Sequence, residues 1–219
     1  MCGRYSITTP TEQLIARFDT EMSVEALPPR YNAAPTQSLP VILNQEPRRI
    51  ELLQWGLIPH WANDPSIGSR MINARAETLT DKPSYREPFQ KRRCLVLADG
   101  FYEWQKTGSG KTPMRIALKS GEPFAFAGLW ATWKNPQGQL VRSFSIITTK
   151  PNALVAPIHD RMPVMLQPED EALWLDNSAG PNDWKELLRP YPAELLTSHA
   201  VSERINSPRN DDAAVVAPV

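Results

Sequence analysis

The stretch Arg93-Cys-Leu-Val-Leu-Ala-Asp-Gly-Phe-Tyr-Glu-Trp104 is the strongest strand signal in the chain. The run from Cys94 to Ala98 is continuously apolar, which is typical of a strand covered on both faces. Carboxylates follow the apolar run, at Asp99 and Glu103. We therefore expect one strand over residues 93–104 that carries the Glu103 carboxylate near its end.

Shorter strand signals lie on both sides of this stretch. Turn residues such as Gln45-Glu-Pro47 and Asn135-Pro-Gln-Gly138 separate successive strands, so antiparallel hairpins are expected. The expected strands outside the central stretch are residues 3–7, 39–44, 50–56, 113–118, 124–133, 140–149 and 195–201.

Helix signals stand before, between and after these hairpins. Thr9-Pro-Thr-Glu12 reads as a capping box with proline at the first helical position. Two later helices each carry a tryptophan, Trp174 or Trp184, on their apolar side. The expected helices cover residues 9–18, 84–92, 168–175 and 181–188, with a further helical stretch after Glu77. The pattern favours an α+β fold in which antiparallel sheets curl toward a barrel with flanking helices.

Length and composition fit one soluble globular domain over residues 1–219. The 219 residues include 41% apolar and 22% charged side chains. The 22 prolines are about twice the usual share, and a proline-rich loop over residues 20–38 is expected to present groups to a ligand. Residues 210–219 either fray as a tail or dock their apolar end. We expect a monomer that needs no metal and no cofactor.

Charge and cysteine content limit the partners and the compartment. Lysine plus arginine and aspartate plus glutamate number 24 each, so any DNA binding must come from a local patch. No apolar run approaches the ~20 residues that cross a bilayer, and no signal segment begins the sequence. Cys2 and Cys94 make no disulfide framework, so a cytoplasmic location is expected. Cys94 is expected to be a small buried thiol.

Cys2 has a distinct chemical potential because it follows the initiator methionine. Removal of Met1 leaves Cys2 with an amine and a thiol on adjacent carbons, a 1,2-aminothiol. The amine condenses with an aldehyde to an imine, and the thiol closes a five-membered thiazolidine ring. These groups titrate near ~7.7–8.0 and ~8.5, so both reach their reactive forms close to neutral pH.

Three further polar side chains stand where local structure gives no reason for them. Glu103 is flanked by Tyr102 and Trp104, so partial desolvation is expected to raise its pKa toward the range useful for proton transfer. His159 lies in a proline-flanked loop and has the side chain that titrates near neutral pH. Asn73 lies between Ile72 and Ala74. Glu103 and His159 also have plainer interpretations, as an exposed edge glutamate and as a histidine bonded to local backbone.

Taken together, six short motifs resemble those of the SOS response-associated peptidase (SRAP) family, in the right order over nearly the whole chain. The motifs are Met1-Cys-Gly-Arg4, Tyr31-Asn-Ala-Ala-Pro35, Trp55-Gly-Leu-Ile-Pro59, Ile72-Asn-Ala-Arg-Ala-Glu77, Ala98-Asp-Gly-Phe-Tyr-Glu-Trp104 and Ile158-His-Asp-Arg-Met-Pro163. The resemblance implies covalent capture of abasic sites in single-stranded DNA by the N-terminal cysteine. It also implies an α+β fold and a protein that joins the nucleoid when bound to DNA.

The resemblance also implies roles for individual residues. Cys2 is the nucleophile, Asn73 holds the cysteine and the opened sugar, Glu103 moves protons, and His159 assists sugar ring opening. The residues implied in DNA contact are Arg4, Arg75 and Arg161 for phosphates, and Pro35, His60 and Trp61 for bases.

One departure from the family pattern concerns base stacking. Some members have a second aromatic residue where this chain has Ala62, so stacking falls to Trp61, His60 or Pro35.

Two other functions stay open at this point. Cys2, His159 and Asn73 have the residue types of a thiol peptidase, and an N-terminal cysteine also suits an amidohydrolase that uses its own amine as base. The protein is alternatively a module that binds DNA without reacting.

Overall fold

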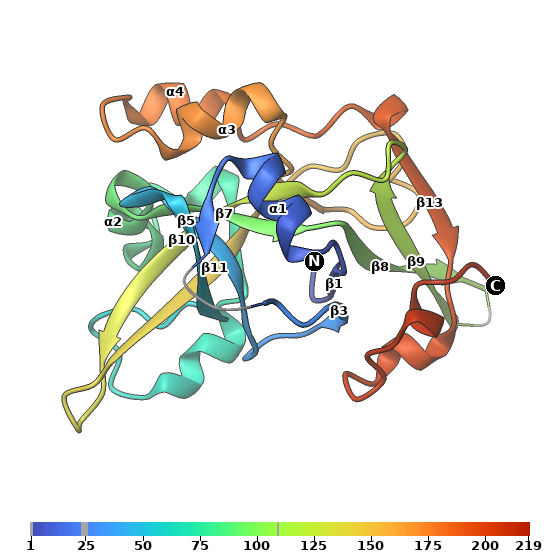
Figure 1. The fold of residues 1–219 in the computed structure, drawn as a ribbon, viewed down its shortest axis with the longest axis horizontal. Coiled ribbons are helices and arrows are strands. Elements are labelled where there is room, and N and C mark those ends of the chain that lie inside the picture. The colour runs from blue at the N-terminus through green and yellow to red at the C-terminus, as the bar shows by residue number, and fades with distance from the viewer. Residues whose placement is uncertain (1, 23–25, 109) are drawn as a thin grey trace.

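Five strands close into a barrel in the computed structural model, which describes residues 2–22, 26–108 and 110–219 (Figure 1). The barrel strands are β4 (Ser38–Leu43), β5 (Glu46–Trp55), β7 (Arg93–Ala98), β10 (Phe124–Lys134) and β11 (Leu140–Thr149). β7 pairs antiparallel with β4 and β10, β10 pairs with β11, and β4 pairs with β5. A parallel pairing of β5 with β11 closes the ring. The expected barrel is confirmed, although not every strand pair is antiparallel.

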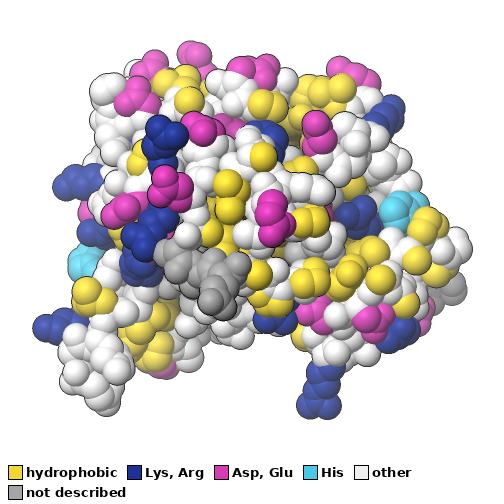
Figure 2. Space-filling view, in the orientation of Figure 1, with side chains coloured by type: hydrophobic (Ala, Val, Ile, Leu, Met, Phe, Trp, Pro, Cys, Tyr) yellow, Lys and Arg dark blue, Asp and Glu magenta, His cyan; other side chains and the backbone are white. Residues whose placement is uncertain are grey.

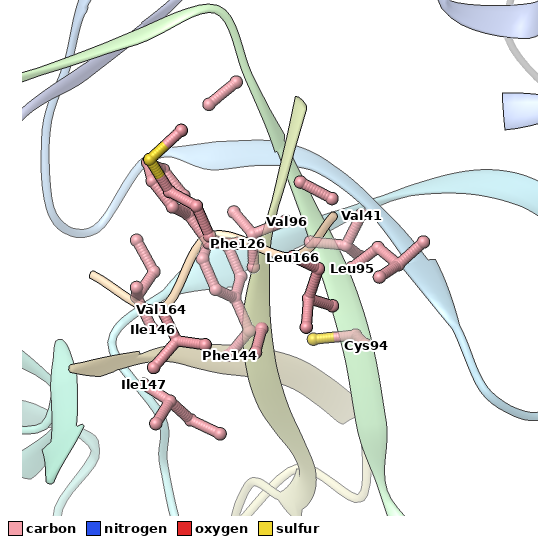
Figure 3. Packing of buried hydrophobic residues seen from close by; sticks show 14 of the residues in the cluster. Val41, Cys94, Leu95, Val96, Phe126, Phe144, Ile146, Ile147, Val164 and Leu166 are labelled. Atoms are coloured by element: carbon pink, nitrogen blue, oxygen red, sulfur yellow. The ribbon is translucent and has the colours of Figure 1, made fainter. Parts of the chain in front are cut away.

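Apolar side chains pack on both faces of β7 (Figure 3), and Trp174 bonds to the Cys94 carbonyl oxygen, so every residue of β7 is buried. Trp55 and Phe144 stack with ring centroids 6.3 Å apart. Gly128 allows β10 to approach β7 closely, because a Cβ atom there would lie 2.8 Å from Cys94 Sγ. Cys94 itself is fully buried, as expected.

The expected single strand over residues 93–104 is in fact two strands that belong to different sheets. β8 (Gly100–Thr107) leaves the barrel and pairs with β1 (Tyr5–Ile7) and β9 (Gly110–Leu118). The second sheet has five strands in the order β13-β9-β8-β1-β3. This corner separates the barrel from the sheet that carries Glu103.

Asp99 fixes the corner between the two sheets. Its buried carboxylate accepts hydrogen bonds from the hydroxyl group of Ser6 and from the backbone N–H and hydroxyl groups of Thr8 and Thr9. Arg115 crosses over Gly100, where a Cβ atom would lie 2.6 Å from the guanidinium. These contacts join β1 to the start of β8, and β1 follows Cys2 directly.

Replacing Asp99 by alanine is expected to destabilise the protein by about 3 kcal/mol, because several donors lose a charged acceptor in a buried corner. At this chain length the loss corresponds to about 6–12 °C in Tm. Thermal unfolding checks it, with Asp64→Ala as the control, since Asp64 caps an exposed turn. Equal Tm losses in the two variants would contradict the assigned role.

The region expected to be a loop over residues 20–38 contains two strands. β3 (Arg30–Ala33) pairs antiparallel with β1, and β2 (Glu21–Met22) pairs parallel with β5. The loop interpretation was wrong here because Asp211, distant in sequence, accepts the backbone N–H groups of Tyr31 and Asn32. The part of this loop at residues 23–25 lies outside the described residues.

In the described part of the chain, α-helices flank the sheets, with α3 and α4 together at the top of the molecule in Figure 1. Trp174 and Trp184 are buried, as predicted. The prediction of a capping box at Thr9 was wrong, because Thr9 bonds to Asp99 and the N-cap position of the first helix is Pro10. The helical stretch expected after Glu77 is a 3-10 helix of three residues, Ala76–Thr78, which includes Glu77. The helices are α1 (Thr11–Phe18), α2 (Pro83–Lys91), α3 (Pro168–Leu175) and α4 (Pro181–Glu186), and the remaining strands are β6 (Asn73–Arg75), β12 (Met162–Pro163) and β13 (Leu196–Ala200).

The C-terminal segment docks onto the second sheet, at the lower right of Figure 1. Val215 is fully buried, and Val201 forms a β-bridge with Pro218. His199 lies 3.0 Å from the Val216 carbonyl oxygen, which fits the structural role expected for it. Of the two possibilities for residues 210–219, docking is therefore the one observed.

Figure 2 shows acidic and basic side chains interspersed on the face drawn, as the balanced composition leads one to expect. Among the described residues, no helix is both long and apolar enough to cross a membrane.

Candidate active site

Cys2 lies just before β1 and has no exposed surface. Its Sγ atom is 3.7 Å from the Arg4 carbonyl oxygen. Burial raises the pKa of the Cys2 thiol well above its usual range, and the nearby Glu103 carboxylate raises it further. The thiol is therefore protonated at neutral pH, and its reaction requires a group that accepts the proton. The expected removal of Met1 concerns a residue outside the described part of the chain.

Asn73 forms a hydrogen bond to the backbone of Cys2. Its backbone is fixed by parallel pairing of β6 with β11, and its carbonyl oxygen accepts a 3.0 Å hydrogen bond from the Tyr85 hydroxyl group. The Asn73 Nδ2 atom donates to the Cys2 carbonyl oxygen at 2.8 Å. Asn73 Oδ1 is buried without a hydrogen-bond partner among the described residues. Because such an acceptor is costly to leave unpaired, this oxygen suits a donor on a bound molecule.

Glu103 and His159 lie together on the Cys2 side of β8. Glu103 is 2% exposed, and burial raises the pKa of its carboxyl group. His159 Nε2 lies 3.9 Å from Glu103 Oε2. A buried carboxyl group with a raised pKa, next to an imidazole, is suited to proton transfer.

The protonation state of His159 determines which group its other nitrogen contacts. The Arg161 backbone N–H points at Nδ1 from 3.1 Å, while Asp160 Oδ1 lies 2.9 Å from the same atom. A neutral ring whose Nδ1 accepts from Arg161 carries its proton on Nε2, facing Glu103. A ring protonated on Nδ1 donates to Asp160 instead, and its Nε2 then carries a proton only in the imidazolium form.

A solvent-open cleft of about 650 Å³ leads to Glu103 and His159. Cys2 and Asn73 do not line this cleft, which reaches Glu103 and His159 from the solvent side. Lys106 and Lys111 also line the cleft. These two lysines were not among the predicted site residues, although a hairpin was expected across residues 107–111, and the register pairs them opposite each other. Tyr85 was also missed, and no local pattern links it to Asn73.

The three arginines predicted to contact phosphates differ in how they are held. Arg4 Nη1 donates to Asn32 Oδ1 at 3.1 Å and to the Ile205 carbonyl oxygen at 3.0 Å. Arg161 forms a two-point ion pair with Glu77, at 2.8 and 3.0 Å. Arg75 has an exposed side chain. Arg75 is thus the most accessible of the three, and Arg161 has to leave Glu77 before it binds a phosphate.

The residues predicted to stack on bases lie in exposed or half-buried positions. Trp61 is 50% exposed, His60 is exposed, and Pro35 is half-buried in the turn after β3. Ala62 is buried against Ile58 and Trp133. A second aromatic ring at position 62 therefore has no room without repacking, which leaves Trp61 as the exposed ring.

The geometry differs from that of a thiol peptidase. In a Cys-His-Asn triad the amide orients the histidine, whereas Asn73 Nδ2 bonds to Cys2. Among the described residues, no group of three or more His, Cys, Asp or Glu side chains is placed to hold a metal ion.

A family model described as SOS response associated peptidase (SRAP) matches residues 1–208. The chain belongs to the SRAP family. Among relatives, "Abasic site processing protein YoqW" of Bacillus subtilis is 44% identical over 99% of each chain. "Abasic site processing protein HMCES" of Gallus gallus is 34% identical over 87% of this chain and 66% of that protein.

Solved structures of other proteins have the same SRAP fold. A protein from Bacteroides thetaiotaomicron superposes with a TM-score of 0.92 at 30% identity and 100% coverage of both chains. A phage-related protein from Bordetella bronchiseptica gives a TM-score of 0.71 at 30% identity, with 92% of this chain and 95% of that one covered.

Proposed function

We propose that this SRAP protein captures abasic sites in single-stranded DNA through Cys2 once Met1 is removed. The observation that carries the proposal is the grouping of Cys2 with Asn73 and Glu103, since Asn73 is bonded to the Cys2 carbonyl and the Glu103 carboxylate raises the pKa of its thiol. The names of its relatives, which denote abasic site processing proteins, support the same substrate. The protein acts as a monomer in the cytosol, at the nucleoid when bound to DNA.

The proposed reaction balances without an oxidant or a cofactor. An abasic deoxyribose is in equilibrium with a ring-opened aldehyde. The Cys2 amine attacks the aldehyde carbon, and the resulting carbinolamine loses water to give an imine. The sulfur then bonds to the same carbon, the electron pair of the C=N bond moves to nitrogen, and the thiol proton ends on that nitrogen. Ring closure removes the imine that would otherwise permit β-elimination and strand cleavage.

The neighbouring side chains move protons and hold the reactants. Glu103 donates a proton to the leaving hydroxyl group of the carbinolamine and takes up the N–H proton as the imine forms. During ring closure it relays the thiol proton to the ring nitrogen. His159 exchanges protons with Glu103 and assists opening of the sugar ring. Asn73 keeps the backbone of Cys2 in place, and its Oδ1 atom accepts a hydrogen bond from the amine or from a sugar hydroxyl group.

Binding of a strand by a protein of zero net charge relies on local groups. Arg75 is accessible at the end of β6. Arg4 belongs to the SRAP motif that contains Cys2, and Arg161 belongs to the one that contains His159. Trp61 supplies a stacking surface, and stacking of one base on an aromatic ring is worth roughly 1–3 kcal/mol.

Incubation of the purified protein with a single-stranded oligonucleotide that contains one abasic site tests the proposal. We expect a complex that survives denaturing electrophoresis. The control oligonucleotide carries a tetrahydrofuran analogue, which has no aldehyde and is expected to give no such complex. A natural abasic site that yields no adduct at all would leave only non-covalent binding.

Replacement of Cys2 by serine distinguishes capture from hydrolysis. We expect Cys2→Ser to lose the stable adduct, because an oxygen analogue of the thiazolidine opens readily in water. Neither form is expected to cleave a fluorogenic peptide or amide. Hydrolysis by the wild-type protein that persists at a lower rate in the serine variant would support the amidohydrolase alternative.

A further inference from the structure

Two lysines lie directly opposite each other at the end of the β8–β9 hairpin. The register pairs Lys106 with Lys111, and both are exposed. Directly opposed residues have Cβ atoms about 4.5–5.5 Å apart, and like charges in this arrangement destabilise a sheet. Within the described part of the chain, neither lysine forms an ion pair that offsets this repulsion. A ligand of opposite charge would relieve it.

The lysine pair and Glu103 line the same cleft. Lys106 is three residues beyond Glu103 along β8, which is about 10 Å of extended chain. Side chains three residues apart point to opposite faces of a strand, so Lys106 and its partner Lys111 meet the cleft at the edge of β8 rather than beside the Glu103 carboxylate. A polyanion that runs along the cleft from Glu103 can reach them there. Asp160, the other charged lining residue, is on the His159 loop and lies against the imidazole.

We infer that Lys106 and Lys111 bind backbone phosphates of the DNA strand on one side of the captured nucleotide. The inference rests on the proposed function, because it takes Glu103 as the position of the lesion. The two ammonium groups give affinity without base specificity, since phosphates carry no sequence information. Because the lysines lie on one side of Glu103 only, they contact the nucleotides on one flank of the lesion.

Salt dependence of binding tests the inference in the full-length protein. The probe is single-stranded DNA with a central tetrahydrofuran site, which binds without reacting. Each phosphate contact in a single strand adds about 0.7 to the slope of log affinity against log salt, so Lys106→Ala/Lys111→Ala is expected to lower the slope by about 1.4. Between about 50 and 200 mM salt, the wild type then loses about sevenfold more affinity than the variant.

Matched variants separate phosphate contact from a change in total charge. Lys119→Ala/Lys185→Ala removes two exposed lysines outside the cleft and is expected to leave the slope unchanged. Lys106→Arg/Lys111→Arg is expected to keep the wild-type slope. Equal slopes for the cleft variant and the wild type, or an equal fall in both alanine pairs, would overturn the inference.

DNA strands that end at the lesion show on which flank of the lesion the two lysines bind phosphates. With DNA that lacks nucleotides on one side, we expect the effect of the cleft substitutions to disappear for one polarity and persist for the other. Equal effects for both polarities would contradict binding on one flank. Failure of the wild type to crosslink natural abasic DNA would instead count against the proposed function, whatever the slopes show.

Discussion

Replacement of Cys2 by alanine is expected to abolish the denaturant-resistant complex with abasic single-stranded DNA. The loss should be at least about 10³-fold, because intramolecular closure of the thiol on the imine has a high effective molarity that no separate thiol reproduces. The measurement is the initial rate of adduct formation on a denaturing gel. Retention of Met1 or addition of an N-terminal tag should be as damaging, since the amine is then blocked.

The second cysteine provides the matched control. Cys94 is fully buried beneath Gly128 in the barrel, and no step of the proposed reaction uses it. Cys94→Ala is therefore expected to crosslink at the wild-type rate. If Cys2→Ala kept the wild-type rate as well, some other nucleophile would form the adduct.

Replacement of Glu103 by glutamine is expected to slow crosslinking by about 10²–10⁴-fold, the usual contribution of a positioned acid or base. Glutamine keeps the shape of the side chain but exchanges no proton, so binding of tetrahydrofuran DNA should change little. Single-turnover rates and equilibrium binding measure the two effects separately, with the exposed Glu122→Gln as control. An unchanged rate would remove Glu103 from proton transfer.

The same substitution is expected to stabilise the protein at neutral pH. Burial raises the pKa of Glu103, so the folded state holds its proton more tightly than the unfolded state does. Stability contributed by this group is therefore full at low pH and falls as pH rises from the ordinary glutamate value through the raised one. Glu103→Gln should gain on the order of 1 kcal/mol, or about 2–4 °C in Tm, near pH 8 but not near pH 4.

Local sequence patterns predicted the elements whose contacts are themselves local. The hairpins β4–β5 and β10–β11 formed where alternating apolar runs met at turn residues, and α3 and α4 buried the predicted tryptophans. The barrel itself follows from such hairpins once β5 meets β11. The pairing of β5 with β11 is parallel, and no local sequence pattern predicts it.

Contacts between distant residues explain the errors. The corner after β7 depends on the Asp99 carboxylate, whose partners lie some ninety positions earlier in the chain. β3 depends on Asp211, about 180 positions later. Neither partner is visible from the local sequence, which is why residues 93–104 were expected to be one strand and residues 20–38 a loop.

The candidate site was predicted partly by chemistry and partly by family resemblance. The apolar neighbours of Glu103 correctly indicated a desolvated carboxylate, and the resemblance suggested its grouping with Cys2, Asn73 and His159. The ion pair that occupies Arg161 was not predictable, because Glu77 lies 84 positions away in sequence.

The central claim is that the nitrogen and the sulfur of one residue both bond to the sugar carbon. Mass spectrometry of the nuclease-trimmed, protease-digested adduct tests it directly. We predict an N-terminal peptide that begins at Cys2, lacks Met1 and carries the sugar remnant with the loss of one water, while its thiol no longer reacts with an alkylating reagent. A remnant on any other residue, or a Cys2 thiol that still alkylates in the adduct, would contradict the account.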